Sequence, residues 1–231
     1  MNKRKVIGYS IFFFVLVIVF LIVVLGDIKS PKDFFKADTY VTLVSNFKSK
    51  SPVLSTVRPF TFTTQDGKPF TEKDMRGKVC VVNYFFTTCK GICPRMNANM
   101  RTMVYEVFKD EPGFMIVSHT VDPETDSAIV LKRYADKLNV DENKWVFLTG
   151  SKLDLYQAAR NSYLLDDPKN AVVNINDQFL HTQFFALVDK NGHVRGQVYD
   201  GLKQDELKQL QSDIKDLLRE KVTPETIAST K

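Results

Sequence analysis

The stretch Cys89-Lys90-Gly91-Ile92-Cys93-Pro94 decides how the rest of the chain is interpreted. An apolar run rich in β-branched and aromatic residues, Val79–Phe86, leads into it and predicts a strand that is buried on both faces. A helix pattern over residues 94–108 leads out of it, and Pro94 stands where a helix tolerates proline best. The sequence therefore predicts that a buried strand delivers two thiols to the N-terminus of a helix.

The patterns around this unit predict an α/β domain with a mixed sheet and helices on both faces. A strand at Phe114–Thr120 would complete a right-handed βαβ unit with parallel strands. Further amphipathic helices, a short strand at residues 145–149 and two hairpins follow from periodicity and turn signals, with Asn191-Gly192 the stronger turn. The hairpins are expected at residues 60–71 and 184–199, and the helices begin near Ala128, Ser151 and Leu207.

The chain divides into five expected segments. Residues 6–25 are uncharged and almost wholly apolar, and such a helix would span roughly 30 Å, so we expect a transmembrane anchor. A cleaved signal peptide is the alternative, but the run is too long and lacks a small-residue cleavage site. Residues 1–5 form a short basic tail, 26–57 a membrane-proximal spacer, 58–222 the folded domain and 223–231 a flexible tail.

The basic tail also bears on topology and partners. Lys3, Arg4 and Lys5 favour a cytoplasmic N-terminus, which predicts a single-pass membrane protein with an extracytoplasmic C-terminal domain. The short tail favours a bacterial inner membrane, with the domain on the periplasmic side, over an organellar membrane. These three residues supply three of the five net positive charges, and what remains is too weak for nucleic-acid binding.

The cysteine pair can serve two kinds of chemistry. Cys93 lies at the expected helix start, where free N–H groups and the helix dipole stabilise an anion, so we expect an acidified Cys93 thiol. A thiolate is both a nucleophile for disulfide exchange and a ligand for a soft metal, and the C-x3-C spacing leaves both uses open. The third cysteine, Cys80, lies in the buried strand and is expected to be a small core residue.

Two residues outside the pair complete the candidate site. His181 precedes the expected strand at 184–188, and in thioredoxin-like proteins the residue entering this strand lies beside the cysteine pair. Two thiolates and one imidazole suit copper, chiefly Cu(I), whereas zinc would need a fourth ligand that is not evident. His181 could instead be an ordinary loop histidine. Asp122 could orient a metal ligand from outside the coordination sphere, or simply begin a turn before Pro123.

Three motifs in order give the chain a family resemblance. They are Gly77 through Pro94 with both cysteines, Val121-Asp122-Pro123-Glu124-Thr125-Asp126, and His181 ahead of Leu187-Val188-Asp189-Lys190-Asn191-Gly192. Together they closely resemble the Sco/SenC family, over Phe60 to the C-terminal helix and, by type, the anchor. The resemblance implies a membrane-anchored, thioredoxin-like protein that binds copper and serves assembly of the binuclear copper centre of cytochrome c oxidase.

By that likeness Cys89, Cys93 and His181 would be the copper ligands, and the same cysteines would cycle between dithiol and disulfide. The resemblance leaves two functions open. One is a copper chaperone without turnover, whose partner is the copper-receiving subunit of the oxidase. The other is a membrane-tethered thiol–disulfide oxidoreductase that reduces cysteines of a copper-receiving protein, with Cys89 the more exposed nucleophile and no need for His181. Both require a thiol reductant as partner in an oxidising compartment.

Overall fold

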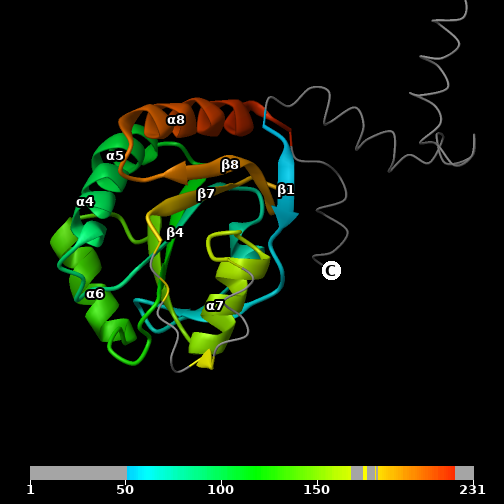
Figure 1. Ribbon diagram of the computed structural model, residues 1–231. Coiled ribbons are helices and arrows are strands. Elements are labelled where there is room, and N and C mark those ends of the chain that lie inside the picture. The colour runs from blue at the N-terminus through cyan, green and yellow to red at the C-terminus, as the bar shows by residue number, and fades with distance from the viewer. Residues whose placement is uncertain (1–50, 168–173, 176–179, 181, 222–231) are drawn as a thin grey trace, which may run out of the picture. The chain divides into compact units, whose positions relative to one another are not determined.

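An eight-stranded mixed sheet organises the part of the chain that the computed structural model describes, residues 51–167, 174, 175, 180 and 182–221 (Figure 1). The strand order is β1-β8-β7-β4-β5-β6-β2-β3. The strands are β1 Val53–Thr56, β2 Thr61–Thr64, β3 Pro69–Thr71, β4 Val79–Phe85, β5 Phe114–Thr120, β6 Trp145–Thr149, β7 Phe184–Val188 and β8 His193–Asp200. The helices are η1 Glu72–Met75, α4 Ile92–Asn99, η2 Met100–Tyr105, α5 Glu106–Phe108, α6 Ala128–Leu138, α7 Lys152–Asn161 and α8 Gln204–Arg219.

Strand β4 lies in the middle of this sheet, between β5 and β7. It pairs in parallel with β5 along its whole length, from Val79 opposite Phe114 to Phe85 opposite Thr120, which confirms the predicted βαβ unit. On its other side it pairs antiparallel with β7. The predicted hairpins are also present, as β2–β3 and β7–β8.

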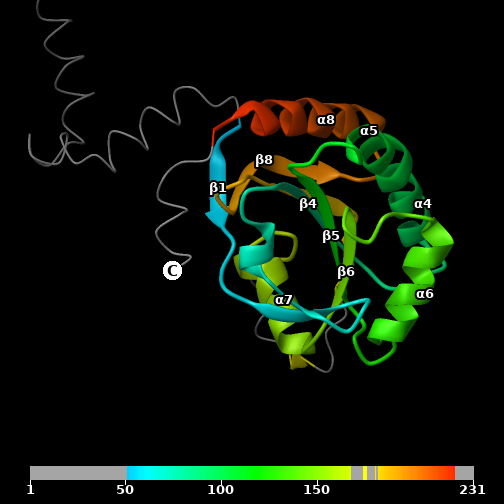
Figure 2. The ribbon, with the colours of Figure 1, turned by 180° about the vertical axis from the view of Figure 1, so that it is seen from behind.

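Helices cover both faces of the sheet, as Figures 1 and 2 show. Helices α4, α5, α6 and α8 lie on one face and α7 on the other. Because successive side chains along a strand face opposite sides of the sheet, all seven residues of β4 are buried. Val81 and Phe85 pack into the core under α4 and α8, whereas Val82 and Tyr84 pack into the core under α7.

Two local predictions need correction. Val53–Thr56 was expected in the spacer, but it forms β1 and pairs antiparallel with β8 at the sheet edge. The sequence hides this strand because it is short and mostly exposed, so backbone pairing rather than an apolar pattern defines it. The helix expected over 94–108 begins at Ile92 and contains the π-helical segment η2. There Thr102 Oγ1 donates to the Ala98 carbonyl at 2.9 Å, a contact that often loosens a helix.

Several predicted features lie outside the described residues: the basic tail, the anchor at 6–25, residues 26–50 of the spacer, His181 and the tail at 223–231. Within the described ranges, every helix is too short or too polar to cross a membrane.

Candidate functional site

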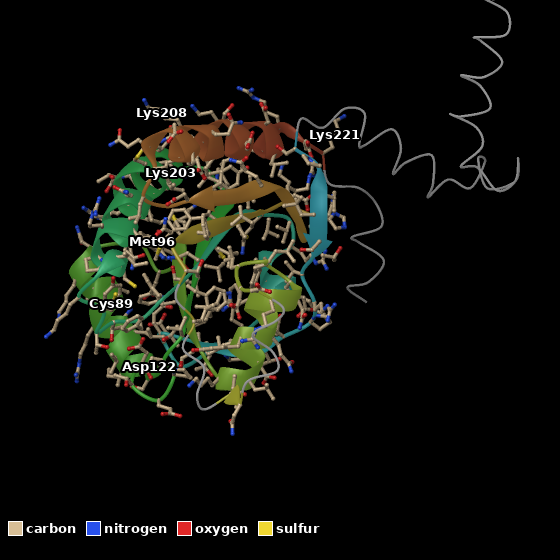
Figure 3. All side chains as sticks on the ribbon, viewed as in Figure 1. Cys89, Met96, Asp122, Lys203, Lys208 and Lys221 are labelled. Atoms are coloured by element: carbon tan, nitrogen blue, oxygen red, sulfur yellow. The ribbon has the colours of Figure 1, made fainter. Side chains whose placement is uncertain are left out.

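The cysteine pair lies at the end of the sheet where β4 leads into α4. Cys89 is half-buried in the connecting loop, and Cys93 is buried in the first turn of α4. Both cysteines are free thiols. Figure 3 labels Cys89 and also Met96, a fully buried residue of α4. The predicted arrangement, with a strand delivering two thiols to a helix start, is confirmed.

Hydrogen bonds make Cys89, rather than Cys93, the acidic member of the pair. Burial raises the pKa of Cys89, but this is outweighed by hydrogen bonds from the Cys93 thiol and from the backbone N–H groups of Cys93, Gly91 and Ile92, so the pKa is lowered. Burial, together with donation to Cys89, raises the pKa of Cys93 to about 12. The sequence-based expectation of an acidified Cys93 is therefore wrong.

The helix N-terminus explains this reversal. The cap residue Gly91 has no side chain to accept from the free N–H groups of the first turn. The sulfur of Cys89 takes that role, because the preceding loop folds it back over the helix start. Cys93 already belongs to the helix, and its side chain packs with Met96 in the core. The N–H groups at the helix start therefore stabilise the thiolate of Cys89, which precedes the helix, more than that of Cys93.

A buried carboxylate, Asp126, fixes the loop that carries Cys89. It is fully buried and accepts hydrogen bonds from the Thr87 backbone N–H at 3.1 Å, from the Thr87 hydroxyl and, at 2.6 Å, from the Thr120 hydroxyl. Asp126 therefore ties the cysteine loop to the end of β5. Sequence reasoning missed this role, although Asp126 closes the motif that begins at Val121.

Asp122, the residue predicted to orient a ligand, takes part in a turn. Its backbone N–H donates to Thr120 Oγ1 at 2.9 Å, and its carbonyl accepts from the N–H groups of Thr125 and Asp126. Figure 3 labels Asp122 and Cys89 at separate positions in this view. The side-chain bonds that hold the cysteine loop come from Asp126 instead.

A chain of buried hydrogen bonds connects the sheet with the two helices beside the cysteines. Trp145 Nε1 donates to Ser118 Oγ at 2.8 Å, and the Ser118 hydroxyl donates to Asn83 Oδ1. Asn83 Nδ2 then donates to Asn97 Oδ1 at 3.2 Å, and Asn97 Nδ2 donates to the Tyr134 hydroxyl oxygen at 2.7 Å. The chain runs through β6, β5, β4, α4 and α6, so it fixes both helices relative to the strands.

A pocket of about 380 Å³ opens next to the sulfur pair. Both cysteines line it, together with Asn97 and Arg101 from the helix that begins at Ile92 and Tyr134 from α6. The pair is therefore accessible to a small group from the side of α6.

The predicted third ligand, His181, is outside the described residues, but the strand that follows it is placed. Val82 pairs with Ala186 in the antiparallel register of β4 and β7, so the start of β7 lies beside the end of β4. The chain thus enters β7 at the same end of the sheet where the cysteine loop leaves β4. Among the described residues, no three His, Cys, Asp or Glu side chains gather to hold a metal.

Several further sulfur and imidazole side chains belong to the core. Cys80 is fully buried, and burial raises its pKa to about 12. The charge of Lys78 lowers this pKa slightly, and the charge of Asp189 raises it slightly. Met96 and Met100 are also fully buried, as expected of packing residues. His119 stacks on Tyr84 with ring centroids 4.9 Å apart, and neither ring nitrogen has a hydrogen-bond partner among the described residues.

Comparison with known proteins identifies the family. The SCO1/SenC family model matches residues 48–219, and the SCO1 protein homolog of Bacillus subtilis is 32% identical over 169 residues, 72% of this chain and 84% of the relative. The chain belongs to the SCO1/SenC family. The resemblance of the three sequence motifs to the Sco/SenC family is thereby confirmed.

Solved structures support the same fold. A SCO1/SenC family lipoprotein from Bacillus anthracis has a TM-score of 0.61 and 33% identity, over 73% of this SCO1/SenC chain and 97% of that one. BsSco has a TM-score of 0.61 and 32% identity, over 74% of this chain and 97% of BsSco. It is described as a member of the Sco family of cytochrome c oxidase assembly proteins, with a disulfide switch. Yeast Sco1 with copper bound, at 24% identity and a TM-score of 0.55 over 77% and 96%, shares the fold. The predicted thioredoxin-like mixed sheet is confirmed.

Proposed function

We propose that this SCO1/SenC protein carries copper for assembly of the binuclear copper centre of cytochrome c oxidase. Cys89, Cys93 and His181 would hold the copper ion, which is cargo for the copper-receiving subunit of the oxidase. One observation carries the proposal: two free sulfurs in hydrogen-bond contact lie at the sheet end where the chain enters β7. Soft thiolates with one imidazole suit Cu(I).

The comparisons add support for this cargo. BsSco is described as a member of a family of cytochrome c oxidase assembly proteins, and the yeast, Bradyrhizobium japonicum and Arabidopsis thaliana Sco structures are described with copper bound. The cysteine pair described above would supply two of the three ligands that the proposal needs, and the third, His181, precedes β7 in the sequence by three residues.

The deciding variant is His181→Ala, with His193→Ala in the β7–β8 hairpin as the matched control. We expect His181→Ala to abolish near-stoichiometric Cu(I) binding and oxidase maturation while thiol–disulfide exchange survives, and His193→Ala to retain all three. Cu(I) titration against a competing chelator and oxidase activity in cells measure these outcomes. Unimpaired maturation with His181→Ala would refute the carrier role.

A second function, a membrane-tethered thiol–disulfide oxidoreductase, is favoured by the lowered pKa of Cys89 beside Cys93. The Cys89 thiolate would attack a disulfide of the copper-receiving protein and form a mixed disulfide. Cys93 would then attack Cys89 and release the second partner thiol, which leaves two electrons on the partner and a Cys89–Cys93 disulfide here. Maturation that needs both cysteines but not His181 would establish this function.

The proposed setting is the outer face of a membrane. We propose that residues 6–25 anchor the chain, that residues 58–222 lie on the periplasmic side of a bacterial inner membrane, and that a thiol reductant keeps the pair reduced. The basic tail and the apolar run support this topology. Protease added to spheroplasts should digest the domain, and protection of the domain would contradict the topology.

A further inference from the structure

We propose that the pocket between α4 and α6 receives a carboxylate-bearing thiol or disulfide, with its carboxylate near Arg101, Lys137 and the Tyr134 hydroxyl and its sulfur at Cys89. The proposal deepens the thiol chemistry of the proposed function, on which it rests, and it is independent of copper binding. It assigns a ligand class to the pocket that opens beside the cysteine pair.

The size and the charge of the pocket favour a small anion. Its volume of about 380 Å³ lies at the lower end of the range for small-molecule sites. Two charged residues line it, Arg101 and Lys137, and both are cationic. No Asp or Glu belongs to the described lining, so an anionic ligand would meet attraction without a nearby repelling carboxylate in the wall.

The two cations have unused capacity for a ligand. The guanidinium of Arg101 contacts Glu106 at 3.4 Å through one terminal nitrogen, while its buried Nε has no hydrogen-bond partner among the described residues. A buried donor without a partner is costly, and a ligand oxygen would relieve that cost. Lys137, in the last turn of α6, forms no salt bridge within the described part of the chain.

The Tyr134 hydroxyl is a third donor, because the buried hydrogen-bond chain ends by donating to its oxygen. Asn97 Nδ2 donates to the Tyr134 oxygen, so that oxygen acts as acceptor and its own proton remains available. Tyr134 lines the pocket beside both cysteines. The hydroxyl, guanidinium and ammonium groups all donate, and an ionised carboxylate only accepts. The donor set therefore matches a carboxylate better than an amine or an amide.

The position of the pocket separates it from the proposed metal side. Strands β5 and β7 flank β4 on opposite sides, and α6, which contributes Tyr134 and Lys137, follows β5. A ligand in the pocket would reach Cys89 from the side away from β7.

The test compares two alkylating probes on the metal-free, reduced full chain. Iodoacetate and iodoacetamide each form an S–C bond with the Cys89 thiolate and release iodide, but only iodoacetate carries a carboxylate. The ratio of their rate constants at Cys89, measured by mass mapping, cancels changes in the nucleophilicity of the thiolate. We expect Arg101→Gln and Lys137→Gln each to lower the iodoacetate-to-iodoacetamide ratio roughly two- to fivefold, and Tyr134→Phe to lower it as well.

Arg133→Gln is the matched control, because Arg133 is an exposed cation of α6 that does not line the pocket. It removes the same charge and should leave the ratio unchanged. The proposal is overturned if the pocket variants leave the ratio unchanged, or if Arg133→Gln lowers it equally. Lys137 is exposed and Tyr134→Phe keeps the ring, so these two variants keep the test valid even if Arg101→Gln unfolds.

Two further arms identify the source of the carboxylate. One compares oxidised glutathione with its ethyl ester, and the other a disulfide-bonded peptide with Asp beside its cysteine against the Asn version. A preference for the acid in either arm that Lys137→Gln reduces supports the proposal and names the source. The proposal is overturned if neither arm shows a preference for the acid. A failed copper test with His181→Ala leaves these metal-free ratios untouched, so the two proposals fail separately.

Discussion

At the scale of single residues, the two cysteines of the pair differ in the pKa of their thiols. Cys93 donates to Cys89, which contributes to the lowered pKa of Cys89 and the raised pKa of Cys93. Cys93→Ala removes that donor, so the pKa of Cys89 should rise and its alkylation midpoint should move to higher pH. Cys93→Ser keeps a hydroxyl donor and should shift the midpoint less. Iodoacetamide rates at Cys89 from about pH 6 to 10 measure this.

Cys80 provides the internal control for that titration, since it is fully buried and should stay unlabelled in the native protein. Equal midpoints in wild type, Cys93→Ser and Cys93→Ala would contradict the hydrogen-bond explanation. The sequence correctly predicted the pair and the helix start, yet it could not reveal which sulfur receives the helix N–H groups. That depends on Cys93 facing the core and on Cys89 folding back over Gly91.

At the scale of elements, the carboxylate of Asp126 holds the cysteine loop against β5. Asp126→Asn keeps the shape but replaces one acceptor oxygen by a donor, which would face Thr87 or Thr120. The free energy of unfolding should fall by roughly 1–3 kcal/mol. Asp122→Asn, a change at a half-buried turn residue, should cost less than about 0.5 kcal/mol. Urea unfolding measures both, and equal losses would contradict the role given to Asp126.

The elements differ in how visible they were in the sequence. The buried strand β4 was evident because all seven of its residues face one core or the other. The edge strand β1 was missed, since its pairing with β8 uses backbone groups that any sequence possesses. The role of Asp126 was hidden for a related reason: its partners, the Thr87 loop and the end of β5, come together only when β4 and β5 pair.

At the scale of the whole molecule, the folded domain begins earlier than the sequence suggested. The carbonyl of Pro52 accepts from the Gly196 N–H at 2.8 Å, and the carbonyl of Ser51 accepts from Arg195 Nε at 2.9 Å. The family match, residues 48–219, likewise includes β1 and ends with α8. The segment that precedes residue 58 is thus in part a structural component of the domain, and the proposed spacer is correspondingly shorter.

The stability of the whole domain should depend on pH through His119, which lies fully buried against Phe62, Tyr84 and Tyr163. Burial lowers its pKa from 6.5 to about 3. Below pH 6.5 the unfolded chain therefore binds a proton that the folded protein excludes, and stability falls as the pH falls. Between pH 6.5 and 4.5 this residue alone should remove roughly 2 to 3 kcal/mol.

His119→Phe removes the ionisable group and keeps an aromatic ring, so it should flatten this part of the pH dependence. The comparison is the change in the free energy of urea unfolding from pH 6.5 to 4.5 within each protein, which separates protonation from any constant packing cost of the larger ring. His193→Gln, at a half-buried hairpin position, should retain most of the wild-type slope. If His119→Phe loses as much stability on acidification as the wild type, other groups cause the loss and the buried imidazole is not the acid-sensitive point of the fold.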